Sequence, residues 1–208
     1  MKRTLSVFGL ILFSLVALAP PAFGVGVFIA GFAATSGGAN PGMHRMSEAT
    51  EIGGLIPGDH FNLAWNDDHD AVIEKIRQAR ANNPDEPVVL IGHSLGATAA
   101  VEMAFTLKRF DIDVDVLVQL ESIAVVSSTN ETTPGNVKHG FNLWSTFEDT
   151  LNGLSQVDGS RNIGIDGTNH ADIDEPDDVG TSSDPDFEGK NAWGIIHCVL
   201  MDVLGGGG

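Results

Sequence analysis

The segment that most constrains the fold is a short apolar run followed by a serine between two glycines. Residues 88–91 read Val-Val-Leu-Ile without polar alternation, which is typical of a strand buried on both faces of a parallel sheet. Apolar residues then recur at helical spacing from Ala97 to Phe105. Ser94 is therefore expected on a tight turn between a buried strand and a helix.

The glycines around Ser94 suit such a turn. Gly92 and Gly96 stand two residues before and two residues after it, and their lack of a side chain allows the strand and the helix to approach closely. The turn would project the serine hydroxyl and direct free helix N–H groups toward an oxyanion formed there. A glycine-rich turn without chemistry is the alternative, because 25 of the 208 residues are glycine.

Strand and helix patterns alternate along the chain. Strands are expected at 25–32, 61–65, 88–91, 114–120, 141–146 and 162–166. One helix should follow the acidic cluster at 67–70 and another should surround Cys198, whereas the glycine-rich stretch 34–46 should be a loop. This order predicts an α/β fold with a mostly parallel sheet and helices on both faces. Ser94 would then lie at the carboxyl edge of the sheet, where open α/β folds place their sites.

The N-terminal region reads as a targeting segment. The chain begins with a basic pair, an apolar run at residues 5–19 and small residues before position 25. This predicts a signal peptide at residues 1–24 and a secreted or periplasmic protein, with an uncleaved anchor as the alternative. Residues 25–204 would form a single compact domain, followed by a glycine tail at 205–208.

Composition excludes several classes of partner. The formal net charge is −17, from 28 acidic and 11 basic residues, and such a surface repels nucleic acid and anionic membranes. We therefore expect no nucleic-acid partner and no stable membrane insertion after signal cleavage. Cys198 is the single cysteine, so no intrachain disulfide can form, and its apolar neighbours predict a buried, inert thiol.

A serine nucleophile needs a base to accept its proton. Three histidines follow Ser94 in the chain. His139 precedes a predicted strand and would sit at the wrong edge of the sheet, and His197 lies within an apolar helical pattern. His170 follows the last parallel strand pattern, in a loop, and is the best candidate for the base.

The acid that would orient this base has two candidate positions. Glu121 directly follows the strand pattern at 114–120, and a carboxylate beside so apolar a run is unexpected unless it has a role there. Glu148 and Asp149 follow the next strand pattern, which is the commoner place for the acid in this fold class. A solvated loop carboxylate is the alternative at each position. We place Glu121 first and Asp149 second.

Five segments in chain order resemble those of small serine hydrolases of the α/β-hydrolase superfamily, of lipase or thioesterase-like type. They are FIAGF, GHSLGA, VLVQLESIAV, PGNVKHGFN and NHADID. The resemblance covers most of residues 25–175 and implies the α/β-hydrolase fold, with no cofactor and no metal. It matches Glu121 to a position usually held by Asp. It also implies an oxyanion hole formed by the backbone N–H groups of Phe32 and Leu95, with Ala30 replacing the usual histidine.

These observations predict an exported enzyme that cleaves carboxylic esters through an acyl-enzyme intermediate, on a small-molecule or lipid substrate. Ser94 would be the nucleophile, His170 the base and Glu121 the acid. A thioesterase or acyltransferase with the same triad is the nearest alternative. A non-catalytic exported binding protein on the same scaffold is the alternative from another class.

Residues 172–188 form an acidic segment with eight carboxylates. Its spacing lacks the glycine and bidentate glutamate of an EF-hand loop, so we expect a solvated acidic loop. Weak Ca²⁺ binding that steadies the loop carrying His170 is the alternative.

Overall fold

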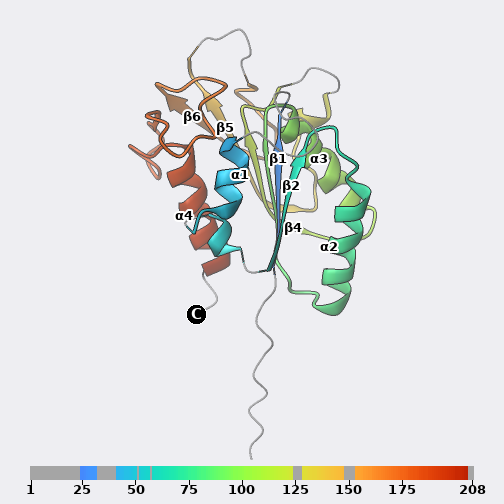
Figure 1. Ribbon diagram of the computed structural model, residues 1–208. Coiled ribbons are helices and arrows are strands. Elements are labelled where there is room, and N and C mark those ends of the chain that lie inside the picture. Colours follow the sequence, from blue (N-terminus) through green and yellow to red (C-terminus); the bar gives the residue numbers. More distant parts are fainter. Residues whose placement is uncertain are drawn as a thin grey trace, which may run out of the picture.

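The computed structural model describes residues 24–31, 41–50, 52–56, 58–123, 128–147 and 153–205. This part of the chain forms an α/β domain with a seven-stranded sheet and four α-helices (Figure 1). The predicted signal peptide lies outside it except for Gly24, as do Phe32 and Asp149. The α-helices are α1 (Pro41–Glu48), α2 (Asp70–Asn82), α3 (Leu95–Lys108) and α4 (Ala192–Gly205). The strands are β1 (Gly24–Ala30), β2 (Gly58–Ala64), β3 (Val88–His93), β4 (Val114–Leu120), β5 (Val137–Ser145), β6 (Arg161–Asp166) and β7 (Thr181–Ser182).

The strand order within the described residues is β2-β1-β3-β4-β5-β6-β7. The first six strands in this order are parallel, and β7 pairs antiparallel with β6. The chain passes outward from β1 to β2 and then crosses back to place β3 on the other side of β1. The carboxyl ends of β1 and β3 therefore flank the point where the strand order reverses, which is where open α/β sheets form binding crevices.

Two apolar cores cover the two faces of the sheet. Helices α1 and α4 lie on one face, and α2 and α3 lie on the other (Figure 1). Successive residues of β3 alternate between the cores, with Ile91 packing toward α1 and α4 and Leu90 toward α2 and α3. This explains why the strand sequence is apolar without alternation, because both faces are buried.

The predicted parallel sheet with helices on both faces is confirmed, and β4 has the predicted bounds. Helix α1 is a correction, because it lies in the stretch expected to be a loop. Pro41 suits a first helical position, and Met43 and Met46, three residues apart, are buried against the sheet.

Three further details differ from the sequence-based expectation. Strand β5 begins at Val137, which places His139 inside the strand rather than before it. Helix α4 extends to Gly205, the first residue of the predicted tail. Cys198 on α4 is half-buried rather than fully buried, because it packs at the margin of the core.

No helix in the described ranges is long and apolar enough to cross a membrane.

The turn between β3 and α3 leaves no room for side chains at its two glycines. A Cβ atom at Gly96 would clash with the backbone carbonyl of Ile29, and one at Gly92 would clash with the carbonyl of Gly96. The obstructing atoms are backbone atoms held in the sheet and helix, so they cannot turn aside as a flexible side chain would.

We predict that Gly96→Ala lowers the free energy of unfolding by about 2 kcal/mol or more, because β1 and α3 must separate to admit the methyl group. Gly54→Ala is the control, since a Cβ there would meet its nearest neighbour at 3.6 Å, and we expect a change within about 0.5 kcal/mol. Urea denaturation followed by circular dichroism measures both. Equal stability of the two variants would contradict the tight turn.

Candidate active site

Ser94 lies on the turn between β3 and α3 and is 4% exposed. Its φ of 58° and ψ of −123° belong to a backbone region that residues with a side chain rarely adopt. The Ser94 N–H donates to the carbonyl of Leu120 at 2.9 Å, which ties the strained residue to the end of β4. The predicted strand-turn-helix context of the serine is confirmed.

His170 lies between Ser94 and Glu121. Its Nε2 atom is 2.9 Å from Ser94 Oγ, and its Nδ1 atom is 3.1 Å from Glu121 Oε2. An ionised carboxylate can only accept, so Nδ1 carries the proton and Nε2 is left to accept the serine O–H. The three residues that the sequence analysis selected as nucleophile, base and first-choice acid are therefore hydrogen-bonded in that order.

Glu121 follows β4 directly and has a φ of 46°. Its side chain is 1% exposed, and its two oxygens are fixed by backbone donors. Oε1 accepts a hydrogen bond from the N–H of Ser145 at the end of β5, and Oε2 accepts one from the N–H of Gly153 at 2.9 Å. These contacts hold a longer acid than Asp in one orientation toward His170.

Gly153 is a supporting residue that sequence reasoning did not find. A Cβ atom there would lie 2.7 Å from Glu121 Cα and 2.8 Å from its carbonyl carbon, so only a glycine permits this close passage. The sequence offered no signal for it among 25 glycines, because the contact joins segments 32 residues apart.

The loop that carries His170 is attached to the rest of the molecule at several points. The His170 carbonyl contacts His93 Nε2 at 2.7 Å, and the carboxylate of Asp174 lies 3.3 Å from His93 Nδ1. Trp193 Nε1 on α4 donates to the Asp174 carbonyl at 2.8 Å. Sequence reasoning did not find the pairing of His93 with Asp174, for which the single available signal was a histidine adjacent to the nucleophile.

One of the two predicted oxyanion donors lies within the described residues. Leu95 is the first residue of α3, where backbone N–H groups have no partner within the helix, and it adjoins Ser94. Phe32 lies outside the described residues. Gly31, the residue before it, runs against the serine, since a Cβ there would lie 2.6 Å from Ser94 Cβ.

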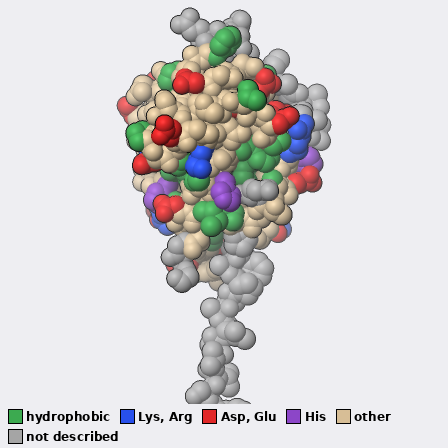
Figure 2. All heavy atoms as spheres, turned by 90° about the vertical axis from the view of Figure 1, so that its left-hand side faces the viewer, with side chains coloured by type: hydrophobic (Ala, Val, Ile, Leu, Met, Phe, Trp, Pro, Cys, Tyr) green, Lys and Arg blue, Asp and Glu red, His purple; other side chains and the backbone are tan. Residues whose placement is uncertain are grey.

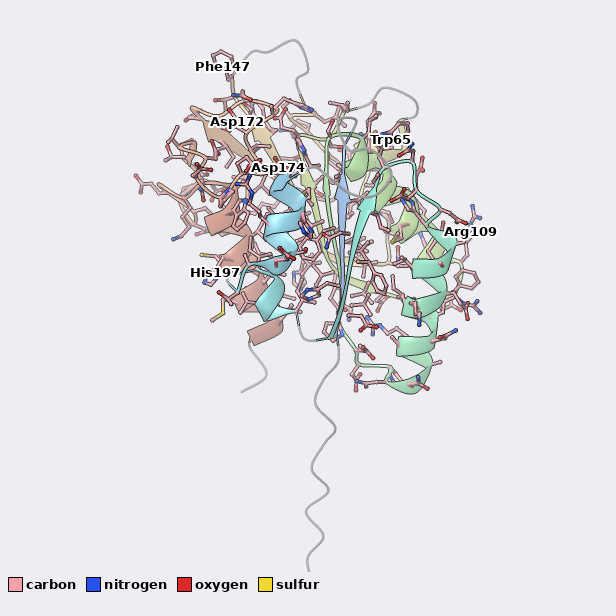
Figure 3. All side chains as sticks on the ribbon, viewed as in Figure 1. Trp65, Arg109, Phe147, Asp172, Asp174 and His197 are labelled. Carbon is pink, nitrogen blue, oxygen red and sulfur yellow. The ribbon has the colours of Figure 1, made fainter. Side chains whose placement is uncertain are left out.

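The other two histidines considered as bases do not reach this site. His139 is exposed on β5 and pairs with Val116 near the amino end of β4, which confirms that it lies away from the carboxyl edge. His197 is half-buried on α4 and lies at the outer side of that helix (Figure 3).

The carboxylates that follow His170 do not form a metal centre. In the ranges that the structure describes, no group of three or more His, Cys, Asp or Glu side chains could hold a metal ion. Glu175 instead pairs with Arg45 on α1 at 2.9 Å, and Arg161 contacts Asp184 and Asp186. Acidic side chains are scattered over the face of α1 and α4 rather than gathered in one patch (Figure 2). The alternative of a Ca²⁺ site has no support in this geometry.

Comparison with known proteins supplies no family for this chain. No protein-family model matches it, and a search of curated proteins found no significant match. Any assignment of activity therefore depends on the geometry of the site.

We predict that Glu121→Gln lowers kcat for ester hydrolysis by about 10³- to 10⁴-fold, because an amide can present N–H to His170 and stabilise the wrong tautomer. Asp149→Asn is the matched control and should leave kcat within about twofold. Steady-state kinetics with a chromogenic ester measures both variants. The reverse pattern would assign the acid to the segment after β5.

Proposed function

We propose that this protein is an exported serine hydrolase of the α/β-hydrolase type that cleaves carboxylic esters through an acyl-enzyme intermediate. The observation that carries the proposal is the hydrogen-bonded series Ser94, His170 and Glu121. Each residue follows the carboxyl end of a parallel strand, namely β3, β6 and β4. The export signal is part of the proposal, and its residues 1–23 lie outside the described part of the chain.

The topology supports the α/β-hydrolase assignment. The serine follows a central strand, the acid follows the adjacent strand, and the histidine follows a later strand of the same parallel sheet. The chain order is serine, acid, histidine, as this fold class requires. The strained φ of Ser94 and the two close glycines match the physical requirements of a nucleophile elbow.

The geometry suits acyl transfer. As Ser94 Oγ attacks the ester carbonyl carbon, His170 Nε2 accepts the hydroxyl proton, and Glu121 stabilises the resulting imidazolium through Nδ1–H. The negative charge on the former carbonyl oxygen would be held by the N–H of Leu95 and, by resemblance, of Phe32. When the tetrahedral intermediate collapses, the ester C–O bond breaks and His170 returns the proton to the leaving alcohol. Water then repeats the sequence on the acyl-enzyme and releases the acid.

We predict that a fluorophosphonate probe labels the wild-type protein at Ser94 and that Ser94→Ala abolishes both labelling and ester hydrolysis, because the activated hydroxyl is the attacking group. Ser160→Ala is the matched control, since Ser160 Oγ contacts Thr133 Oγ1 at 2.7 Å and plays no part in the site. Intact-mass spectrometry and hydrolysis of p-nitrophenyl acetate are the measurements.

Three outcomes would contradict all or part of the proposal. Hydrolysis by Ser94→Ala at about a tenth of the wild-type rate or more would exclude Ser94 as the nucleophile. A wild-type protein that is neither labelled nor active on esters and thioesters of varied acyl length would favour a non-catalytic binding protein. Faster turnover of thioesters than of matched oxygen esters would assign the same triad to a thioesterase.

A further inference from the structure

His93 directly precedes Ser94, and its side chain is buried beside the base. Its Nε2 atom lies 2.7 Å from the carbonyl oxygen of His170, and the two imidazole rings are 5.1 Å apart between centroids with a tilt of 39°. A carbonyl oxygen can only accept a hydrogen bond, so His93 Nε2 carries a hydrogen and is the donor of this hydrogen bond. The residue adjacent to the nucleophile thus holds the backbone of the base.

The other nitrogen of His93 faces a buried carboxylate. Asp174 Oδ2 is 3.3 Å from His93 Nδ1, and the Asp174 side chain is fully buried. Neither carboxylate oxygen accepts a hydrogen bond of good geometry from the residues that the structure describes, so the contact is best described as an ion pair. A buried carboxylate without hydrogen bonds is strongly unfavourable unless a positive charge lies beside it.

These contacts favour a positive charge on His93. Nε2 donates to a carbonyl and Nδ1 faces a carboxylate, and the imidazolium form, with a hydrogen on each nitrogen, suits both partners. Burial lowers the pKa of His93, but the adjacent Asp174 carboxylate, the His170 carbonyl and the charge of Glu121 outweigh it and raise this pKa above its usual value.

Asp174 itself is anchored away from the catalytic turn. Its carbonyl accepts the indole N–H of Trp193 on α4, and the next residue, Glu175, pairs with Arg45 on α1. Figure 3 shows Asp174 near the upper end of α1, on the α1 and α4 side of the sheet. The segment from His170 to Asp174 is therefore held at one end by β3 and at the other by the helices of that face.

We propose that His93 and Asp174 form a buried positioning pair for His170. The imidazolium of His93, held by Asp174, donates Nε2–H to the His170 carbonyl and so fixes the base at hydrogen-bonding distance from Ser94. His93 and Ser94 are consecutive residues, so the same turn carries the nucleophile and the contact that holds the base. The proposal rests on the proposed hydrolase function.

Two double variants separate the hydrogen bond from the charge. His93→Gln with Asp174→Asn removes both charges and keeps an N–H donor, whereas His93→Met with Asp174→Asn has nearly the same shape and no donor. We expect kcat of the Gln variant to exceed that of the Met variant by about tenfold or more, with KM equal within about twofold, because displacing a catalytic group impairs the chemical step. Thermal unfolding of both variants is recorded alongside the kinetics.

The pH profile of Asp174→Asn supplies a second measurement if the Met variant does not fold. In the wild type, loss of the His93 proton at alkaline pH leaves an Nδ1 lone pair facing the Asp174 carboxylate, and the resulting repulsion loosens the pair. We expect kcat to decline as pH rises through the raised pKa of His93. The amide introduced by Asp174→Asn would instead donate to neutral His93, so the variant should lack this decline.

The outcomes distinguish this proposal from the function on which it rests. A wild-type protein that neither reacts with the probe nor hydrolyses esters contradicts the proposed function, and the positioning role fails with it. Two results in an active enzyme would overturn the positioning pair alone. One is equal kcat for the Gln and Met double variants, and the other is the same decline of kcat at alkaline pH in the wild type and in Asp174→Asn.

Discussion

The candidate site depends on strained backbone at the ends of two adjacent strands. Ser94 after β3 and Glu121 after β4 both have positive φ. Each is held there by a backbone hydrogen bond to the next strand, from Ser94 N–H to Leu120 and from Glu121 N–H to Leu143, both at 2.9 Å. Such conformations persist only where the surroundings over-determine them, and the parallel sheet supplies that constraint. Because the sheet is rigid, Ser94 and Glu121 are both held facing His170, which lies in a loop.

Much of this arrangement could be predicted from sequence because it follows from local rules. An apolar run, two glycines and a helical pattern define the turn around Ser94. The order of the strands favours His170 over His139, and the apolar helical pattern around His197 sets that residue aside. The choice of Glu121 over Asp149 could not be derived, because both follow strand patterns and only the fold shows the 3.1 Å contact with His170. Asp149 lies outside the described residues.

The supporting residues could not be predicted, for a different physical reason. His93 contacts a carbonyl 77 residues away, and Gly153 is defined by its close approach to the backbone of Glu121. Neither relation leaves a periodic pattern in the sequence. Helix α1 was missed because Gly37, Gly38 and Gly42 surround Pro41, whereas burial of Met43 and Met46 against the sheet stabilises the helix.

The two margins of the sheet have a consequence for how this protein behaves at high concentration. Strand β7 is two residues long, and the segment that follows it is held at β6 by the ion pairs of Arg161 with Asp184 and Asp186, so β7 exposes few backbone groups to which another chain could pair. Strand β2 at the opposite margin begins with exposed Gly58 and Asp59, and a charge there disfavours strand addition. Together with a net charge of −17, these margins oppose aggregation through open strands and favour a protein that stays dispersed.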